Sequence, residues 1–360
     1  MITLSLCMIV KDEQAVLSRA LSCMQGIADE IIVVDTGSSD QTPDIARQYT
    51  PHVFSFPWAQ DFAAARNFAC SKATMDYWMW LDADDVITPA NQEKLRQMKH
   101  SLDPDTDIVM MKYLTGFDAQ GNATFSYERE RIIKNAPRFR WHGRVHEAII
   151  PQGNIVHLDI AIEHRKVKPG SPDRNLHIYE TMLANGETLE PRHQFYYARE
   201  LYDHQRYPEA IRAFEHFLQQ DGWVENRIDA CLHLSRCHAC LGHVEQSLLV
   251  LFRSFCFDVP RAEICCEIGA HWMEHQGYRQ AIYWYQQALS APRDETSGAF
   301  IQADCYDYIP FIQLCVCYDR LGEHATAFSY HQRAKAIKPQ AEAVQLNTQY
   351  FQTLFASSKT

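Results

Sequence analysis

The sequence predicts an α/β N-terminal domain with a mostly parallel sheet, followed by an all-helical C-terminal domain. Short apolar runs alternate with helix-spaced segments over the first third of the chain, and helical patterns alone follow from about residue 192. The 360 residues suffice for two domains that each bury a core. We expect the first domain at 1–170, with a linker or lid to about 190, and the second at 191–345.

Four runs in the first third have the composition of strands. The expected strands are 2–10, 30–35, 53–56 and 77–82, and the expected helices between them are 14–23, 42–49 and 62–72. Ligands of such sheets bind beyond the carboxyl ends of the strands. Polar residues follow three of these strands, at Lys11–Glu13, Asp35–Asp40 and Asp82–Asp85. These residues are therefore the candidates for a binding site.

A similar segment recurs in the C-terminal half. Its copies begin at Arg206, Gly242, Gly277 and Gly322, so successive starts are 36, 35 and 45 residues apart, and the polar segment 292–298 lengthens the last interval. An aromatic-rich helix, a turn and an Ala-containing helix at this period resemble the tetratricopeptide repeat. Four units would form a short solenoid with a concave face for an extended partner, and an unrelated helical bundle is the alternative.

Composition excludes several classes of protein. The formal net charge of -11 argues against a broad electrostatic interaction with nucleic acid. The first apolar run ends at Lys11, which is too short for a membrane span, and has no basic leader, so we expect a cytoplasmic protein.

The cysteines also limit the possible functions. Nine of the 12 lie from Cys231 onward and match no zinc-site spacing, because the Cys237–Cys240 pair has no second pair. We expect buried free thiols, with a redox or zinc role as the alternative.

An apolar strand ends in a cluster of carboxylates at Asp82, Asp84 and Asp85. Like charges this close repel one another unless a cation or water offsets them, which favours a divalent metal. An acidic turn or helix cap is the alternative.

Two more residues suggest a nucleotide ligand. Asp35, at a strand end before a Gly-Ser-Ser loop, could accept hydrogen bonds from a nucleobase or ribose, although capping by Ser38, Ser39 or Asp40 explains the loop as well. Arg66, within Asp61–Asn67, could bind a phosphate or lie on the surface. The sequence contains neither the dinucleotide-binding nor the P-loop glycine motif.

The ordered blocks SLCMIVKDE, EIIVVDTGSSDQT, DFAAARN and WLDADD resemble the inverting family-two glycosyltransferases of the GT-A fold, over about 1–164. The resemblance implies a nucleotide-sugar donor, which we expect to be a UDP-hexose, and a divalent cation, Mn²⁺ or Mg²⁺. It also implies donor contacts from Glu13, Asp35, Arg66 and Asp82, and metal binding by the DXD pair Asp82 and Asp84.

The segment Phe139–Glu147 resembles the WxGxVHE segment of a subset of these transferases. It implies a general base, for which we expect Glu147 first and His146 second. A purely structural pairing of Glu147 with Arg144 or Arg140 is the alternative.

Two predictions concern the chain after this segment. In relatives, a His near position 164 can complete the metal shell, so we expect His164 as a ligand, with an incidental exposed His as the alternative. The basic stretch 165–175 could be a linker, or a lid from which Lys168 and Arg174 contact the donor diphosphate.

The order of the two domains is similar to that of sublancin-type peptide S-glycosyltransferases. It implies a peptide or protein acceptor, modified at Cys or Ser and bound with help of the repeats. A saccharide or lipid-linked acceptor is one alternative, and a non-catalytic repeat scaffold is another. The edges of the repeats could also form a homodimer interface.

Overall fold

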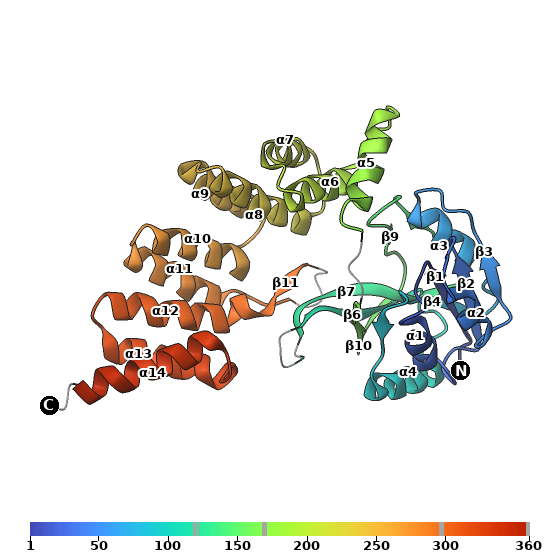
Figure 1. Ribbon diagram of the computed structural model, residues 1–360, viewed down its shortest axis with the longest axis horizontal. Helices are drawn as coiled ribbons and strands as arrows, with labels where there is room; N and C mark the ends of the chain where they lie inside the picture. The colour runs from blue at the N-terminus through green and yellow to red at the C-terminus, as the bar shows by residue number, and fades with distance from the viewer. Residues whose placement is uncertain (118–120, 122, 168–170, 295–298, 358–360) are drawn as a thin grey trace. The chain divides into compact units, whose positions relative to one another are not determined.

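The computed structural model describes residues 1–117, 121, 123–167, 171–294 and 299–357 (Figure 1). One compact unit contains residues 1–196, and the other contains most of residues 197–360. The first is an α/β unit and the second is helical, so the predicted fold class is confirmed. The division between the units lies within α6 (Pro191–Asp203), and the functional boundaries at 170 and 191 stay predictions.

The sheet of the first unit is mixed. Its strands are ordered β3-β2-β1-β4-β7-β6-β10-β5. The first four strands of this order, β3, β2, β1 and β4, run parallel to one another, and β6 and β10 are parallel as well. Strand β7 is antiparallel to its neighbours β4 and β6. The bounds are β1 (Leu4–Val10), β2 (Glu30–Asp35), β3 (Val53–Ser55), β4 (Tyr77–Trp80), β5 (Asp85–Val86), β6 (Ile108–Phe117), β7 (Ala123–Lys134) and β10 (Ile155–His164). A separate hairpin pairs β8 (Trp141–His142) with β9 (Ala148–Ile149).

Both faces of the central strands are buried, which explains their continuous apolar sequences. In β1, Leu4 and Leu6 pack on one face in a core that includes Leu17 of α1, while Cys7 packs on the other with Ala69 of α3. The expected helices are present with shorter bounds. They are α1 (Leu17–Cys23), α2 (Thr42–Arg47) and α3 (Phe62–Cys70), and α4 (Pro89–Ser101) and α5 (Arg174–Ala184) follow.

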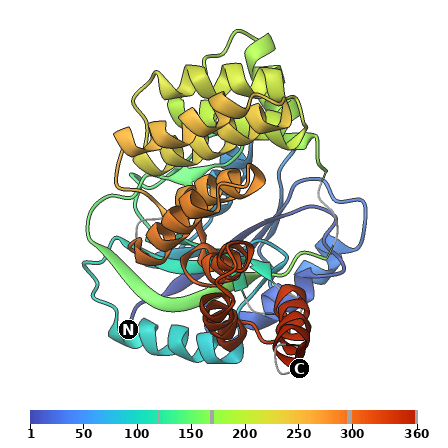
Figure 2. The same ribbon diagram turned by 90° about the vertical axis from the view of Figure 1, so that its left-hand side faces the viewer.

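The second unit is a succession of helix pairs, in which α8 packs on α9, α10 on α11 and α12 on α13 (Figures 1 and 2). The predicted repeat starts lie just before the second helix of each pair, as the tetratricopeptide pattern requires. The helices are α7 (Tyr207–Leu218), α8 (Val224–Cys240), α9 (Val244–Arg253), α10 (Ala262–Glu274), α11 (Tyr278–Ser290), α12 (Tyr308–Arg320), α13 (His324–Ile337) and α14 (Glu342–Ser357).

Short elements interrupt this succession. They are 3₁₀ turns at Ser254–Cys256 and Ala303–Tyr306 and the strand β11 (Ile301–Gln302). The predicted polar insertion at 292–298 lies partly outside the described residues.

All 12 cysteines are free thiols. Of the nine from Cys231 onward, Cys240 and Cys256 are exposed and the other seven are buried. The prediction of buried thiols is therefore wrong for these two, because Cys240 ends α8 and Cys256 ends a 3₁₀ turn. Among the helices that the structure describes, none is long and apolar enough to cross a membrane.

Candidate active site at the carboxyl edge of the sheet

A cavity of about 660 Å³ opens beyond the carboxyl ends of β1 and β4. Its wall also includes the end of β10 and the start of α5, so segments from the whole first unit reach it. Eight predicted site residues line this cavity: Glu13, Arg66, Asp82, Asp84, His146, Glu147, His164 and Arg174. The predicted position Lys168 lies outside the described residues.

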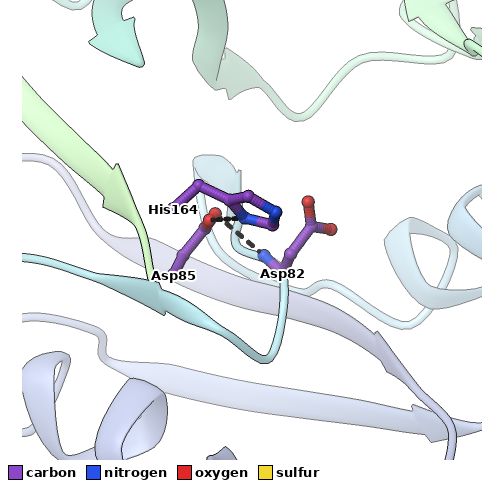
Figure 3. A group of neighbouring side chains, drawn as sticks. All are labelled: Asp82, Asp85 and His164. Carbon is purple, nitrogen blue, oxygen red and sulfur yellow. Dashed lines mark hydrogen bonds and ion pairs between the residues drawn. The ribbon is translucent and has the colours of Figure 1, made fainter. Parts of the chain in front are cut away.

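Asp82 and His164 line this cavity and form, with the buried Asp85, an acidic cluster that contains one imidazole (Figure 3). Asp82, Asp85 and His164 each offer one ligand atom, and these atoms lie within 4.8 Å of one another. The His164 Nδ1 also lies 3.3 Å from the Asp84 Oδ1. Carboxylate oxygens and imidazole nitrogen are suitable ligands for manganese-like ions, so this set fits a divalent cation.

Asp85 has a different environment from the other two aspartates, because its side chain is fully buried. One of its oxygens accepts a hydrogen bond from the Asp82 backbone N–H at 3.0 Å and pairs with the Arg131 guanidinium at 3.2 Å. The other oxygen accepts from the Tyr113 hydroxyl at 2.8 Å and lies 3.2 Å from the His164 Nδ1. Asp85 therefore orients the candidate ligands, a role that the sequence analysis missed.

The charges of the cluster shift its pKa values in different directions. Burial raises the pKa of Asp82, but Arg66, together with Arg131 and His164, brings it down to about 2. Burial and the neighbouring aspartates raise the pKa of Asp84, although His164 opposes them. Burial lowers the pKa of His164, but the hydrogen bond to Asp85 and the charge of Asp84 produce a net increase. Negative charge is thus concentrated here.

Arg66 joins two carboxylates that are far apart in the sequence. Its Nε donates to the Glu147 Oε1 at 2.6 Å, and its Nη2 donates to the Asp82 Oδ1 at 2.7 Å. The guanidinium lies 4.8 Å from the ring centre of Trp80 and 5.0 Å from that of Trp141. Burial lowers the pKa of Arg66, but Asp82 and Glu147 raise it further, so the side chain stays charged.

Glu147 therefore pairs with Arg66 and not with the two arginines considered from the sequence. Arg144 donates to Glu187 at 2.8 Å, and Arg140 donates to the Pro137 carbonyl at 3.2 Å. Only 12% of the Glu147 side chain is exposed. The base candidate is thus fixed in position at the cavity wall.

The loops after β1 and β2 form the opposite part of the site. The Glu13 backbone N–H donates to the Thr42 hydroxyl at 2.7 Å, and Glu13 lines the cavity. The Asp35 carboxylate accepts from the backbone N–H groups of Gly37 and Ser38 at 3.3 and 3.2 Å, while its neighbour Thr36 lines the cavity. Asp35 therefore shapes the turn beside the cavity.

The cations that line the cavity include residues that the sequence analysis did not select. Arg174 begins α5 and lies 4.6 Å from the ring centre of Phe62. Lys166 and Arg129 also line the cavity. The alternating charges of Glu128–Arg131 within a strand could have indicated Arg129, since buried strands rarely carry unpaired charge.

One family model matches most of the first unit. Residues 5–157 match the family model described as Glycosyl transferase family 2. A TPR repeat-containing protein of Synechococcus elongatus is 36% identical over 149 residues, which are 41% of this chain and 36% of that protein.

Several relatives bear glycosyltransferase names, among them the following two. The SPbeta prophage-derived glycosyltransferase SunS of Bacillus subtilis is 27% identical over 58% of this chain and 51% of its own length. The lipopolysaccharide core biosynthesis glycosyltransferase LpsC of Rhizobium meliloti is 27% identical over 42% of this chain and 58% of its own. The chain thus spans between 36% and 58% of the length of these three relatives.

A solved structure of MamA from Desulfovibrio magneticus matches 48% of this chain and 89% of its own, with 15% identity and a TM-score of 0.38. A score of this size identifies no shared function.

Proposed function

We propose that this chain, whose residues 5–157 form a glycosyltransferase family 2 domain, transfers a hexose from a nucleotide diphosphate sugar to a side chain of a peptide or protein. The donor we expect is a UDP-hexose. One observation carries the proposal: the Asp82–Asp84 turn with His164, and Glu147 with Arg66, meet on one cavity of this domain. Donor binding and acceptor activation need these two groups at one place.

The first group serves the donor. Asp82, Asp84 and His164 would hold a divalent cation, Mn²⁺ or Mg²⁺, because their oxygen and nitrogen donors suit it. When bound, such a cation neutralises negative charge on the donor diphosphate. Arg66 fixes the Asp82 carboxylate at 2.7 Å, and Arg174 adds positive charge to the cavity wall.

The nucleoside belongs at the ends of β1 and β2. Glu13 and Thr36 line the cavity there, and the turn formed by Asp35 fixes the backbone beside them. Carboxylates at such strand ends accept hydrogen bonds from ribose or base. This proposal gives Asp35 and Glu13 the donor contacts.

The second group serves the acceptor. Glu147 takes the proton from the acceptor thiol, hydroxyl or amide, whose lone pair forms the new bond to the anomeric carbon. The bond from that carbon to the diphosphate oxygen breaks, and the nucleotide leaves with the electron pair. Attack opposite the leaving group inverts the anomeric centre. His146, on the same wall, is the second candidate for the base.

A peptide or protein acceptor is supported by the helical unit. The similarity to SunS covers 58% of the chain, which is longer than the matched domain at residues 5–157. Stacked helix pairs present an extended surface to which a polypeptide segment can bind. We propose Cys or Ser as the modified residue, and a cytoplasmic location for the reaction.

A saccharide or lipid-linked acceptor is the second candidate. It is favoured by the similarity to LpsC, whose name places it in lipopolysaccharide core biosynthesis. The two candidates share the donor chemistry and differ only in the acceptor.

The proposal is tested by incubating the full chain with UDP-, GDP- and dTDP-sugars, with Mn²⁺ or with a chelator, and measuring nucleotide release. Peptides containing Cys or Ser and oligosaccharides serve as acceptors, and mass spectrometry identifies the product. We expect release that requires Mn²⁺ and a suitable acceptor.

The matched variants are Asp84→Ala and Asp105→Ala, the second at an exposed aspartate in the loop before β6. We expect loss of turnover only in the first. If no nucleotide sugar binds or reacts, the chain is a non-catalytic scaffold. If Asp84→Ala keeps metal-dependent turnover, the site assignment is wrong.

A further inference from the structure

The loop that carries Glu147 has an unusual backbone. Between β8 and β9, Gly143 has a φ of 95° and His146 a φ of 50°. A non-glycine residue in the left-handed region persists where the surrounding structure determines it. The residues that pack against this loop therefore decide where Glu147 lies.

Much of this packing comes from α5, α6 and the turn between them. A Cβ on Gly143 would lie 2.2 Å from the Cε1 of His193, so only glycine fits against this ring. The Arg144 Nη2 donates to both carboxylate oxygens of Glu187, at 2.8 and 3.0 Å. Burial, then the charge of Arg192, lowers the pKa of His193 to about 4, so its ring is neutral beside the loop at pH 7.

His146 contacts two residues of α6, one through its ring and one through its backbone carbonyl. Its ring stacks on Tyr196 with centroids 4.0 Å apart and planes within 8°, and Tyr179 of α5 continues the stack at 6.4 Å. Its backbone carbonyl accepts from the Nε and Nη2 of Arg192, both at 3.3 Å. These contacts fix both the side chain and the peptide plane that leads into Glu147.

We propose that the α5–α6 hairpin sets the geometry of the catalytic loop, with Tyr196 and Arg192 as positioning residues that act through His146 on Glu147. The inference rests on the proposed function. It implies that the part of the chain needed for transfer continues beyond residue 157, where the family match ends, to Tyr196. The first helices after the sheet are then part of the active site's support.

The test compares Tyr196→Ala with Tyr196→Phe and Tyr197→Ala in the full chain. Phenylalanine keeps the stack on His146, and Tyr197→Ala changes the adjacent tyrosine while leaving that stack intact. In Tyr196→Ala we expect kcat to fall by about 100-fold, the cost of a small misplacement of a catalytic group. The KM for the nucleotide sugar should stay within about twofold, because the donor contacts lie elsewhere.

Hydrogen exchange of residues 142–149 gives a readout that does not depend on turnover. We expect faster exchange of this segment in Tyr196→Ala, and wild-type exchange in Tyr196→Phe and Tyr197→Ala. If Tyr196→Ala does not fold, Arg192→Ala replaces it, since that change removes the two donors to the His146 carbonyl and the guanidinium 5.0 Å from the Tyr196 ring centre while the Tyr196 side chain stays.

The outcomes separate the two proposals. A wild-type chain that turns over no nucleotide sugar contradicts the proposed function, while the exchange measurement still tests the support of the loop. An active enzyme in which Tyr196→Ala changes neither kcat nor exchange overturns the positioning role. An equal loss in Tyr196→Phe and Tyr196→Ala also overturns it, because the stack survives in the first.

Discussion

The two units use the same charged residue types in different ways. In the α/β unit, Asp82 and Glu147 converge on Arg66 at the wall of a cavity, and only 9% of the arginine side chain is exposed. In the helical unit, ion pairs join one helix pair to the next, as between Arg236 of α8 and Glu267 of α10, which are 33% and 30% exposed. We interpret the charges that converge on the cavity as part of a catalytic site, and the charges that bridge neighbouring helices as stabilising ion pairs.

The energetic consequences differ as well. Removing one partner of a buried ion pair costs about 3–5 kcal/mol, because the other charge is left without compensation. A pair that is about one-third exposed contributes roughly 0.2–1 kcal/mol. Mutations can therefore distinguish the two uses of charge.

The largest effect is expected for Arg66→Met. It leaves the buried Glu147, and Asp82 at 32% exposure, without their partner, so the free energy of unfolding should fall by about 3–5 kcal/mol and turnover should be lost. Denaturant unfolding measures the change, with Arg96→Met, at a side chain that is 41% exposed, as the control. A decrease in the free energy of unfolding below about 1 kcal/mol would show that the pairing of Arg66 with the two carboxylates contributes little to stability.

Glu147→Gln should act chiefly on turnover, and it also removes one of the two carboxylates that pair with Arg66. Turnover should fall by about 100-fold or more, while the affinity for the nucleotide sugar is kept, because the general base is lost and the donor contacts remain. Steady-state kinetics and calorimetry give the two values, and Glu93→Gln on the exposed face of α4 is the control. Wild-type turnover in Glu147→Gln would transfer the role of base to His146.

Gly269→Ala should destabilise the helical unit only. The added Cβ would lie 2.8 Å from the Tyr285 ring between α10 and α11, and such overpacking costs about 1–3 kcal/mol. We expect a lower unfolding midpoint with nucleotide-sugar binding unchanged. Weaker nucleotide-sugar binding in the folded variant would mean that the helical unit also contributes to donor binding.

The stability should also depend on pH through His193. Its folded pKa of about 4 lies below the ordinary 6.5, so the unfolded chain binds more protons between these values. Stability is then lost as pH falls from about 6.5 towards 4, by on the order of 1–2 kcal/mol between pH 7 and 5. Arg192 and His146 act in the same direction as burial, and Glu190 opposes them. His193→Gln should reduce this loss of stability when unfolding is measured as a function of pH. An unchanged pH profile would mean that another group causes the loss.

The smallest effect is expected for the Arg236–Glu267 pair. Each of Arg236→Met and Glu267→Met should lower the free energy of unfolding by roughly 0.2–1 kcal/mol, with donor binding unchanged. A double-mutant cycle measures the coupling. A coupling above about 3 kcal/mol would place this pair in the same class as Arg66.

Local patterns in the sequence predicted the local parts of this structure. The apolar runs of β1, β2 and β4 and the repeat interval of the helical unit depend on neighbours within one element or one helix pair. The long β6–β7 pair was missed, and the charges at Glu128–Arg131 hide the strand character of β7.

The arrangement of the site depends on long-range packing. Arg66 and Glu147 are 81 positions apart, and nothing in either segment alone reveals that they form a pair. The fully buried Asp85 and its partners Tyr113 and Arg131 likewise meet only in the folded sheet. Sequence motifs thus selected eight residues of the wall but could not predict which of them hold the others in place.

Calorimetric titration of UDP-glucose tests the central claim most directly, with GDP- and dTDP-sugars in parallel and with Mn²⁺ or a chelator. The wild-type chain and Glu147→Gln should bind a nucleotide sugar with Mn²⁺ and bind it much more weakly with the chelator, whereas Asp84→Ala should lose this difference. Metal-independent binding by all three proteins, or no binding by the wild-type chain, would contradict the assignment of this cavity as a donor site.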